Sequence, residues 1–199
     1  MWRMKKAGMS SIGGIVAAFL LVSPALSAEL SEKSVRTFMS YAWSLVPQQF
    51  TPPNGKKIII DKSKPKEVMV PLDVAREVIR VGRMSAHAQI CDLAEEQTKN
   101  YRSLMKRQSL KGKWTPQQMV YISQLHLTTV MLLTGKIKVT VKDGDKEVVV
   151  DDGSKSQAQT CSDEQRAKVK EVITAYVKAG PDIASNTRGA VKAQPTAKK

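Results

Sequence analysis

Apolar residues recur every three or four positions along four stretches of this chain, the spacing that places them on one face of a helix. The first stretch covers residues 31–46 and stops at Pro47, which cannot continue a helix. The second begins after Pro71 and continues to Leu104. It predicts one long helix or a kinked pair of helices, with Gly82 as the weakest point.

The third stretch has no charged residue between Trp114 and Gly135, so it predicts the most deeply buried helix. Thr115, Pro116 and Gln118 provide an N-cap, a proline at the first helical position and a capping box. Polar residues interrupt the run too often for a membrane span. We therefore expect this helix at the centre of the fold.

The fourth stretch predicts a last helix that begins at a Ser162 cap, with Gln165 in the capping-box position. Gly180 and Pro181 end it. Residues 181–199 show no apolar periodicity and carry a positive net charge, which predicts a disordered basic tail.

Two pairs of short β-branched runs predict two small hairpins. Residues 57–60 and 67–70 form the first pair, and residues 137–141 and 148–150 form the second around an Asp-Gly turn. The predicted fold class is therefore mainly α. About four helices pack as a small bundle, the second of them long or kinked, with two small β-hairpins and a flexible C-terminal tail.

The first 28 residues have the three-part order of a secretory signal peptide. A basic start precedes an apolar run at residues 12–22, which is too short to span a bilayer. Small residues allow cleavage after Ser27 or Ala28. We predict a signal peptide at 1–28 and a single helical domain with two hairpins at 29–180. Export through this signal places the protein in a bacterial periplasm, with full secretion as the alternative.

Composition fits one globular unit with a strong positive charge. The 199 residues are 42% hydrophobic and 25% charged, which excludes a wholly disordered chain and a polytopic membrane protein. Lys and Arg total 32 against 18 Asp and Glu, giving a net charge of +14. This excess predicts an anionic partner or surface.

The two cysteines, Cys91 and Cys161, are predicted to form a disulfide in an oxidising compartment. The competing interpretation is a redox-active thiol at Cys161, because a thiolate is favoured at a helix N-terminus. No C-x-x-C motif accompanies Cys161, so the structural disulfide is preferred.

The sequence offers little material for catalysis. His87 and His126 are the two histidines, and no G-x-S-x-G motif or phosphate-binding glycine cluster is present. His126 lies in the uncharged helix, where a core histidine with a satisfied hydrogen bond is the preferred interpretation. We predict no enzyme, no catalytic residue and no cofactor.

An acidic turn on the second helical stretch raises the question of a metal site. Asp92, Glu95 and Glu96 lie close together, but no E-x-x-H motif accompanies them. Ion pairs with Lys99 at helical spacing explain Glu95 and Glu96 better. We therefore predict no metal site.

Positive charge is concentrated where acidic residues are absent. No Asp or Glu occurs between Gln97 and Lys142, and a row of arginines precedes this segment with His87 in the same register. The competing interpretation is scattered solubilising charge. The candidate anion-binding residues are Arg76, Arg80, Arg83, Arg102, Lys106, Arg107, Lys111 and Lys113.

Location limits the choice of partner. Export argues against nucleic acid, leaving anionic envelope components, acidic proteins and peripheral contact with a membrane surface. The leading hypothesis is an exported, non-enzymatic interaction protein with a disulfide-tied helical core and a basic surface for such a partner. The first alternative is a periplasmic chaperone or stress-response protein that exposes apolar helical faces. The second is a hydrolase or redox enzyme using His126 or Cys161. The sequence does not fix the oligomeric state.

Overall fold

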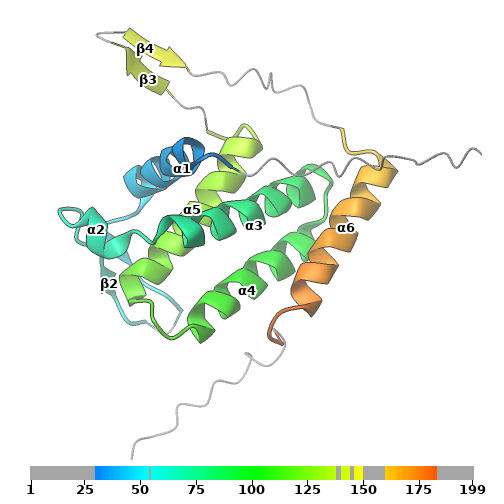
Figure 1. The fold of residues 1–199 in the computed structure, drawn as a ribbon, viewed down its shortest axis with the longest axis horizontal. Helices are drawn as coiled ribbons and strands as arrows, with labels where there is room; N and C mark the ends of the chain where they lie inside the picture. The colour runs from blue at the N-terminus through cyan, green and yellow to red at the C-terminus, as the bar shows by residue number, and fades with distance from the viewer. Residues whose placement is uncertain (1–29, 54, 138–139, 144–145, 150–159, 183–199) are drawn as a thin grey trace, which may run out of the picture.

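The computed structural model describes residues 30–53, 55–137, 140–143, 146–149 and 160–182. The predicted signal peptide and most of the predicted tail lie outside these residues. The described part is mainly helical, with six helices and two small two-stranded sheets (Figure 1). The predicted four-helix bundle is not confirmed, because the chain forms more helices than expected.

The helix boundaries follow the capping signals in the sequence. Capping boxes at Thr115 and Ser162 are both present, as predicted. Ser31 caps the first helix by accepting a hydrogen bond from the backbone N–H of Ser34. The helices are α1 (Glu32–Leu45), α2 (Pro65–Val68), α3 (Leu72–Ile90), α4 (Ala94–Leu110), α5 (Pro116–Leu133) and α6 (Asp163–Lys178).

Helix α5 forms the centre of the packing, as its lack of charge predicts. It contacts α1, α3 and α4, and Ile122 and Leu125 are fully buried. Tyr121 is also fully buried, and its hydroxyl donates to the carbonyl oxygen of Met39 on α1 at 3.0 Å. This hydrogen bond satisfies the one polar group that Tyr121 brings into the core.

Gly82 lies at a close contact between α3 and α5, and α3 passes through it without a break. A Cβ atom at this position would lie 2.8 Å from Thr129 Cβ and 3.3 Å from the backbone oxygen of His126. The glycine therefore permits close packing of two helices rather than a kink.

The second helical stretch divides ten residues after Gly82, at Asp92. Asp92 has a positive φ of 54°. The N–H of Leu93 donates to the oxygen of Ala88 at 2.8 Å, and that of Asp92 donates to Gln89 at 3.2 Å. These two bonds form a Schellman motif with aspartate in the left-handed position that glycine usually takes. The stretch is thus a pair of helices, and it divides at this turn, whose left-handed conformation Asp tolerates, rather than at Gly82, the predicted weakest point.

The first predicted hairpin pairs different segments from those expected. Strand β2 (Ile58–Ile59) pairs antiparallel with β1 (Gln49–Phe50), with Ile58 opposite Phe50 and Ile59 opposite Gln49. The first two residues of the predicted partner run, Glu67 and Val68, instead belong to α2, which begins at Pro65. Proline is favoured in the first turn of a helix, so local capping overrides the β propensity of the following valine.

The second predicted hairpin is confirmed as an antiparallel pair of strands. Strand β3 (Thr140–Asp143) pairs with β4 (Lys146–Val149). The two residues between them, 144 and 145, lie outside the described residues.

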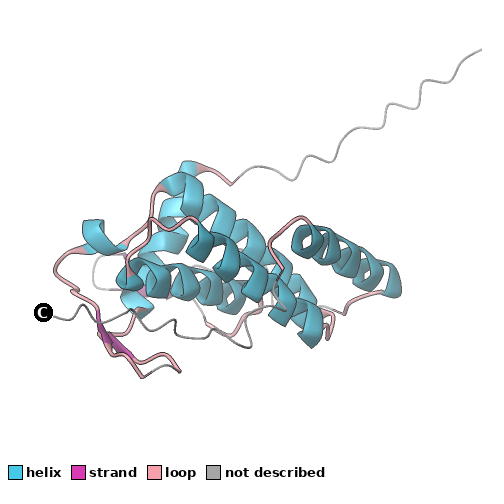
Figure 2. Cartoon of the chain, turned by 90° about the horizontal axis from the view of Figure 1, so that it is seen from below, coloured by secondary structure: helices cyan, strands magenta, loops and turns pink. Residues whose placement is uncertain are grey.

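Helix α6 lies at the edge of the group of helices, as its label in Figure 1 and the same side of Figure 2 show. It contacts α4 and α3, and Ile173 is its one fully buried residue within the described part. Ile173 belongs to a small apolar cluster with Ala88, Cys91 and Leu93, separate from the main core. Packing alone therefore holds α6 less firmly than the other long helices.

Replacing Gly82 with alanine is expected to destabilise the fold by up to about 2 kcal/mol. Overpacking against Thr129 costs about 1–3 kcal/mol, and the better helix propensity of alanine returns about 1 kcal/mol. Urea unfolding measures the difference. Ser40→Ala, on the exposed side of α1, is the control for propensity alone. A Gly82→Ala variant more stable than the parent would contradict the close packing.

Candidate functional site

The predicted disulfide between Cys91 and Cys161 is present. Its Cα atoms are 5.0 Å apart and its cysteines are separated by 70 residues. Cys91 is the C-cap residue of α3, and Cys161 immediately precedes the Ser162 cap of α6. The disulfide thus joins the Schellman turn at the end of α3, which holds Cys91, to the start of α6, which holds Cys161.

Polar contacts join the remainder of α6 to α4. The Arg107 guanidinium lies over the Tyr176 ring, 4.4 Å from its centroid, and donates to the Tyr176 carbonyl oxygen at 2.6 Å. Lys170 forms an ion pair with Glu96 at 3.6 Å. Arg107 therefore interacts favourably with the negative end of α6, close to its last carbonyl groups.

The surroundings of Arg107 are tightly packed and contain unpaired polar atoms. Arg107 Nε, Ser103 Oγ and the Tyr176 hydroxyl are buried without a hydrogen-bond partner in the described residues. A Cβ atom on Gly180 would lie 2.8 Å from Arg107 Nη2, so a side chain there would require the guanidinium to shift. Burial raises the pKa of Tyr176 to about 12, against the opposing effect of Arg107.

Three of the eight candidate cations lie on α3. Arg80 is exposed, whereas Arg76 and Arg83 are half-buried. His87 continues the row and is exposed. Arg80 and Arg83 form no ion pair with a described carboxylate, and of the two only Arg80 is exposed to solvent.

The other five candidates lie on α4 and the turn that follows it, and the fold uses several of them. Arg107 is held by α6, and Lys111 pairs with Glu77 at 3.1 Å. Lys113 lies over the Trp114 ring at 4.6 Å. Lys106 is half-buried, and Arg102 is exposed without an ion pair to a described carboxylate.

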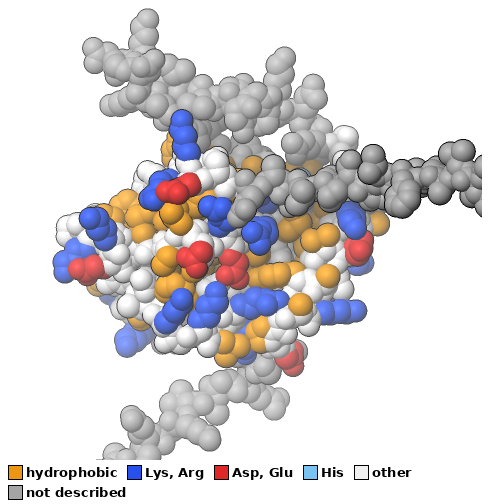
Figure 3. Space-filling model, viewed as in Figure 1, with side chains coloured by type: hydrophobic (Ala, Val, Ile, Leu, Met, Phe, Trp, Pro, Cys, Tyr) orange, Lys and Arg blue, Asp and Glu red, His pale blue; other side chains and the backbone are white. Residues whose placement is uncertain are grey.

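The two basic rows lie on neighbouring helices, because α3 and α4 pack against each other. Figure 3 shows Lys and Arg side chains over both helices on one face, with acidic side chains between them. We call Arg80, Arg83 and Arg102 the basic face. These three cations are the candidates that the described structure leaves without an ion pair or an aromatic contact.

One lysine that the sequence did not single out has a structural role. Lys62 Nζ donates to the carbonyl oxygens of Trp43 and Val46 and lies 4.3 Å from the Trp43 ring centroid. It therefore satisfies carbonyl groups at the C-terminal end of α1. Burial lowers the pKa of Lys62.

His126 is a core histidine with a hydrogen bond, as predicted. It is 5% exposed, and its Nε2 lies 2.9 Å from Ser85 Oγ on α3. Asn100 on α4 donates to the same oxygen at 3.0 Å. Because Ser85 accepts from Asn100, its own proton is available for His126. No local sequence signal identifies Ser85 and Asn100 as partners, since they come from other helices.

A serine beside a histidine also resembles the start of a hydrolytic site, but the geometry does not provide access. Ser85 is fully buried, and no described carboxylate bonds to His126. Burial lowers the pKa of His126 to about 4, so the ring is neutral near pH 7. The arrangement joins α3, α4 and α5 inside the core.

No group of three or more potential metal ligands occurs among the described residues. Glu95 pairs with Lys99 at 2.6 Å, as predicted. Glu96 pairs with Lys170 on α6, whereas the sequence suggested Lys99. Ion pairing with lysines therefore accounts for both of these carboxylates.

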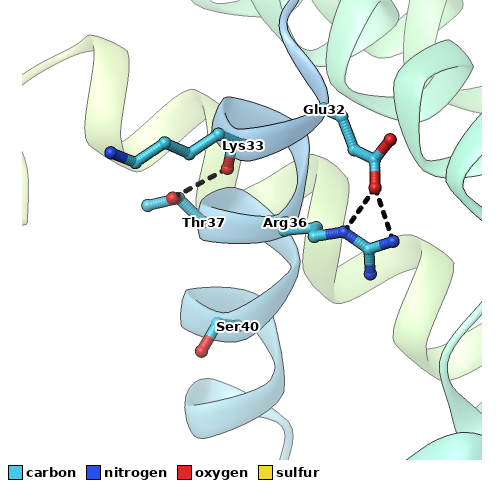
Figure 4. A pocket seen from close by; sticks show the side chains of 5 residues that line it. All are labelled: Glu32, Lys33, Arg36, Thr37 and Ser40. Atoms are coloured by element: carbon cyan, nitrogen blue, oxygen red, sulfur yellow. Dashed lines mark hydrogen bonds and ion pairs between the residues drawn. The ribbon is translucent and has the colours of Figure 1, made fainter.

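An open depression of about 490 Å³ lies beside α1 (Figure 4). The described residues that line it all belong to α1. Its one arginine, Arg36, already pairs with Glu32 at 2.6 Å. Lys33 is the lining cation without a described ion-pair partner, and a single exposed lysine does not define a ligand site.

Comparisons with protein families, curated proteins and solved structures find no match to this chain. Within the described residues, every helix is too short or too polar to cross a bilayer.

Replacing both Cys91 and Cys161 with alanine is expected to lower the free energy of unfolding by about 4 kcal/mol. The reason is that the disulfide closes a long loop and fastens a weakly packed helix. Urea unfolding measures the loss, and hydrogen exchange locates it. Amides of α6 should lose protection before those of α5. Unchanged protection in α6 would contradict the role given to the disulfide.

Acidification is expected to destabilise the fold through His126. Its pKa is about 6.5 when unfolded and about 4 when folded, so the unfolded chain binds the proton more tightly. The stability from neutral His126 is complete above pH 6.5 and is lost as pH falls to about 4. The loss is about 3 kcal/mol. His126→Gln, which cannot titrate, should lack this part of the pH dependence in urea unfolding. Equal slopes in both proteins would contradict the assignment.

Proposed function

We propose that this chain is an exported, non-enzymatic interaction protein that binds an anionic envelope component through the basic face. The observation that carries the proposal is the uncompensated charge of Arg80, Arg83 and Arg102 on two adjacent helices. Guanidinium groups bind phosphate and carboxylate oxygens with paired hydrogen bonds.

Two features support an extracytoplasmic location. The Cys91–Cys161 disulfide is the kind of bond that persists in an oxidising compartment. The tripartite pattern of residues 1–28 is typical of a cleaved signal peptide. In such a compartment the abundant polyanions are phosphorylated lipids, glycolipids, cell-wall polymers and acidic proteins.

The cations differ in how much charge they can offer a partner. Arg107 and Lys62 are held at helix C-termini, and Lys111 is paired with a carboxylate. An incoming anion would have to displace these contacts. Binding at Arg80 and Arg102 displaces no ion pair to a described residue, so these positions favour the anion most.

Changing Arg80, Arg83 and Arg102 together to glutamine is expected to weaken retention on an anionic envelope fraction by roughly fivefold for each arginine. Retention should also fall steeply between about 0.05 and 0.5 M salt, because exposed charges are screened. Pull-down from the fraction across this range measures both effects.

The matched control replaces three cations that already have carboxylate partners: Arg36, Lys99 and Lys168. It removes the same net charge, so it should change retention much less if the basic face is the site. Equal losses in both triple variants, or retention independent of salt, would contradict the proposal.

A further inference from the structure

Exposed apolar side chains gather at one end of the helical bundle. Six large apolar side chains of the described residues are exposed, and four of them belong to the end of α1, to β1 and β2, and to the end of α4. These are Leu45, Phe50, Ile59 and Leu110, with Leu110 the most exposed at 64%. The same end holds α2 and the start of α5 (Figure 1).

The strand register explains why one of these side chains faces away from the core. Ile58 lies opposite Phe50 and packs against the main core. Neighbouring residues of a strand point to opposite faces, so Ile59 points outward, and it is 56% exposed. Strand β2 also contacts α5, whose first turn directly follows the turn after Leu110.

The segments that carry these apolar side chains are rich in lysine. Residues 48–66 contain five lysines and one aspartate, and residues 106–118 contain four cations and no acidic residue. Lys57, Lys66 and Lys113 are exposed and form no ion pair with a described carboxylate. Trp114, beside Lys113, is half-buried at the same turn.

We propose that this end of the bundle docks peripherally on the surface of an anionic lipid bilayer. Ile59 and Leu110 enter the boundary between headgroups and acyl chains, while Lys57, Lys66 and Lys113 contact lipid phosphates. The inference rests on the proposed function and names anionic lipid as an anion that the protein binds, through lysines that do not belong to the basic face.

The combination of side chains favours a lipid surface over a soluble polyanion or an acidic protein. A soluble polyanion can neutralise the lysines, but it offers no apolar phase for Leu110 or Ile59. A bilayer interface supplies both, because apolar side chains insert beside the headgroups while each nearby lysine is attracted to anionic lipid. An aromatic ring such as that of Trp114 is also favoured at this depth.

Co-sedimentation with lipid vesicles tests the proposal, using the processed chain with its disulfide intact. Vesicles of phosphatidylglycerol and phosphatidylethanolamine should bind it, and vesicles of phosphatidylcholine alone should not. Changing Lys57, Lys66 and Lys113 to glutamine should weaken partitioning by roughly fivefold per lysine. The double variant Leu110→Ser/Ile59→Ser should weaken it further at unchanged charge, by roughly tenfold.

Val172→Ser is the matched control for the apolar variant, because Val172 is an exposed apolar residue on α6, away from this end. It should leave vesicle binding unchanged. All the replaced side chains are exposed, and far-ultraviolet circular dichroism checks that each variant folds.

Two results would overturn the docking proposal. One is a lack of binding to anionic vesicles, and the other is binding that Leu110→Ser/Ile59→Ser leaves unchanged. Retention on an envelope fraction stripped of lipid distinguishes this failure from failure of the proposed function. Retention on the stripped fraction without vesicle binding assigns the basic face to a protein or polymer. If the protein neither binds vesicles nor is retained on the stripped fraction, the proposed function is removed as well.

Discussion

Helix α5 has no charged side chain, and its burial determines where the charges of the described fold lie. It packs against α3 so closely that Gly82 admits no Cβ atom beside Thr129. The helices around it bury their apolar sides on α5 and turn their charged sides outward. The basic face is a consequence of this arrangement, because the cations of α3 and α4 have no charged partner in the centre.

Two cations, Lys62 and Arg107, bond to backbone carbonyl groups of the fold rather than face solvent, and both lie at the C-terminal end of a helix. Lys62 donates to the last carbonyl groups of α1, and Arg107 donates to one of the last of α6. Such contacts are favourable because the carbonyl ends of helices carry partial negative charge. They also connect elements far apart in sequence. Together with the disulfide, Arg107 compensates for the limited apolar contact of α6.

The sequence predicts those elements whose signals are local. The capping boxes at Thr115 and Ser162 are confirmed because each uses residues within one turn. The disulfide could be predicted because two cysteines allow one pairing. The break at Asp92 could not, since neither glycine nor proline marks it. The pairing of β2 with β1 could not be predicted either. Residues 57–60 and 67–70 both have suitable β propensity, so the choice of partner depends on the fold.

The candidate site was predictable only as a set of cations. Charge counting finds Arg80, Arg102 and Arg107 equally well. It cannot show that Arg107 turns inward, because its partner Tyr176 lies 69 residues away in sequence. The hydrogen bond of His126 was expected, but its partner Ser85 is 41 residues away and follows from helix packing.

The account depends on a disulfide-tied protein that works outside the cytoplasm, where anionic envelope surfaces are available to its cations. The most direct test is mass spectrometry of the native protein from separated cell fractions, with free thiols alkylated before digestion. The account predicts an envelope or secreted protein that begins at Ala28 or Glu29, with Cys91 and Cys161 joined and unlabelled. A cytoplasmic protein that begins at Met1, with both cysteines alkylated, would contradict it.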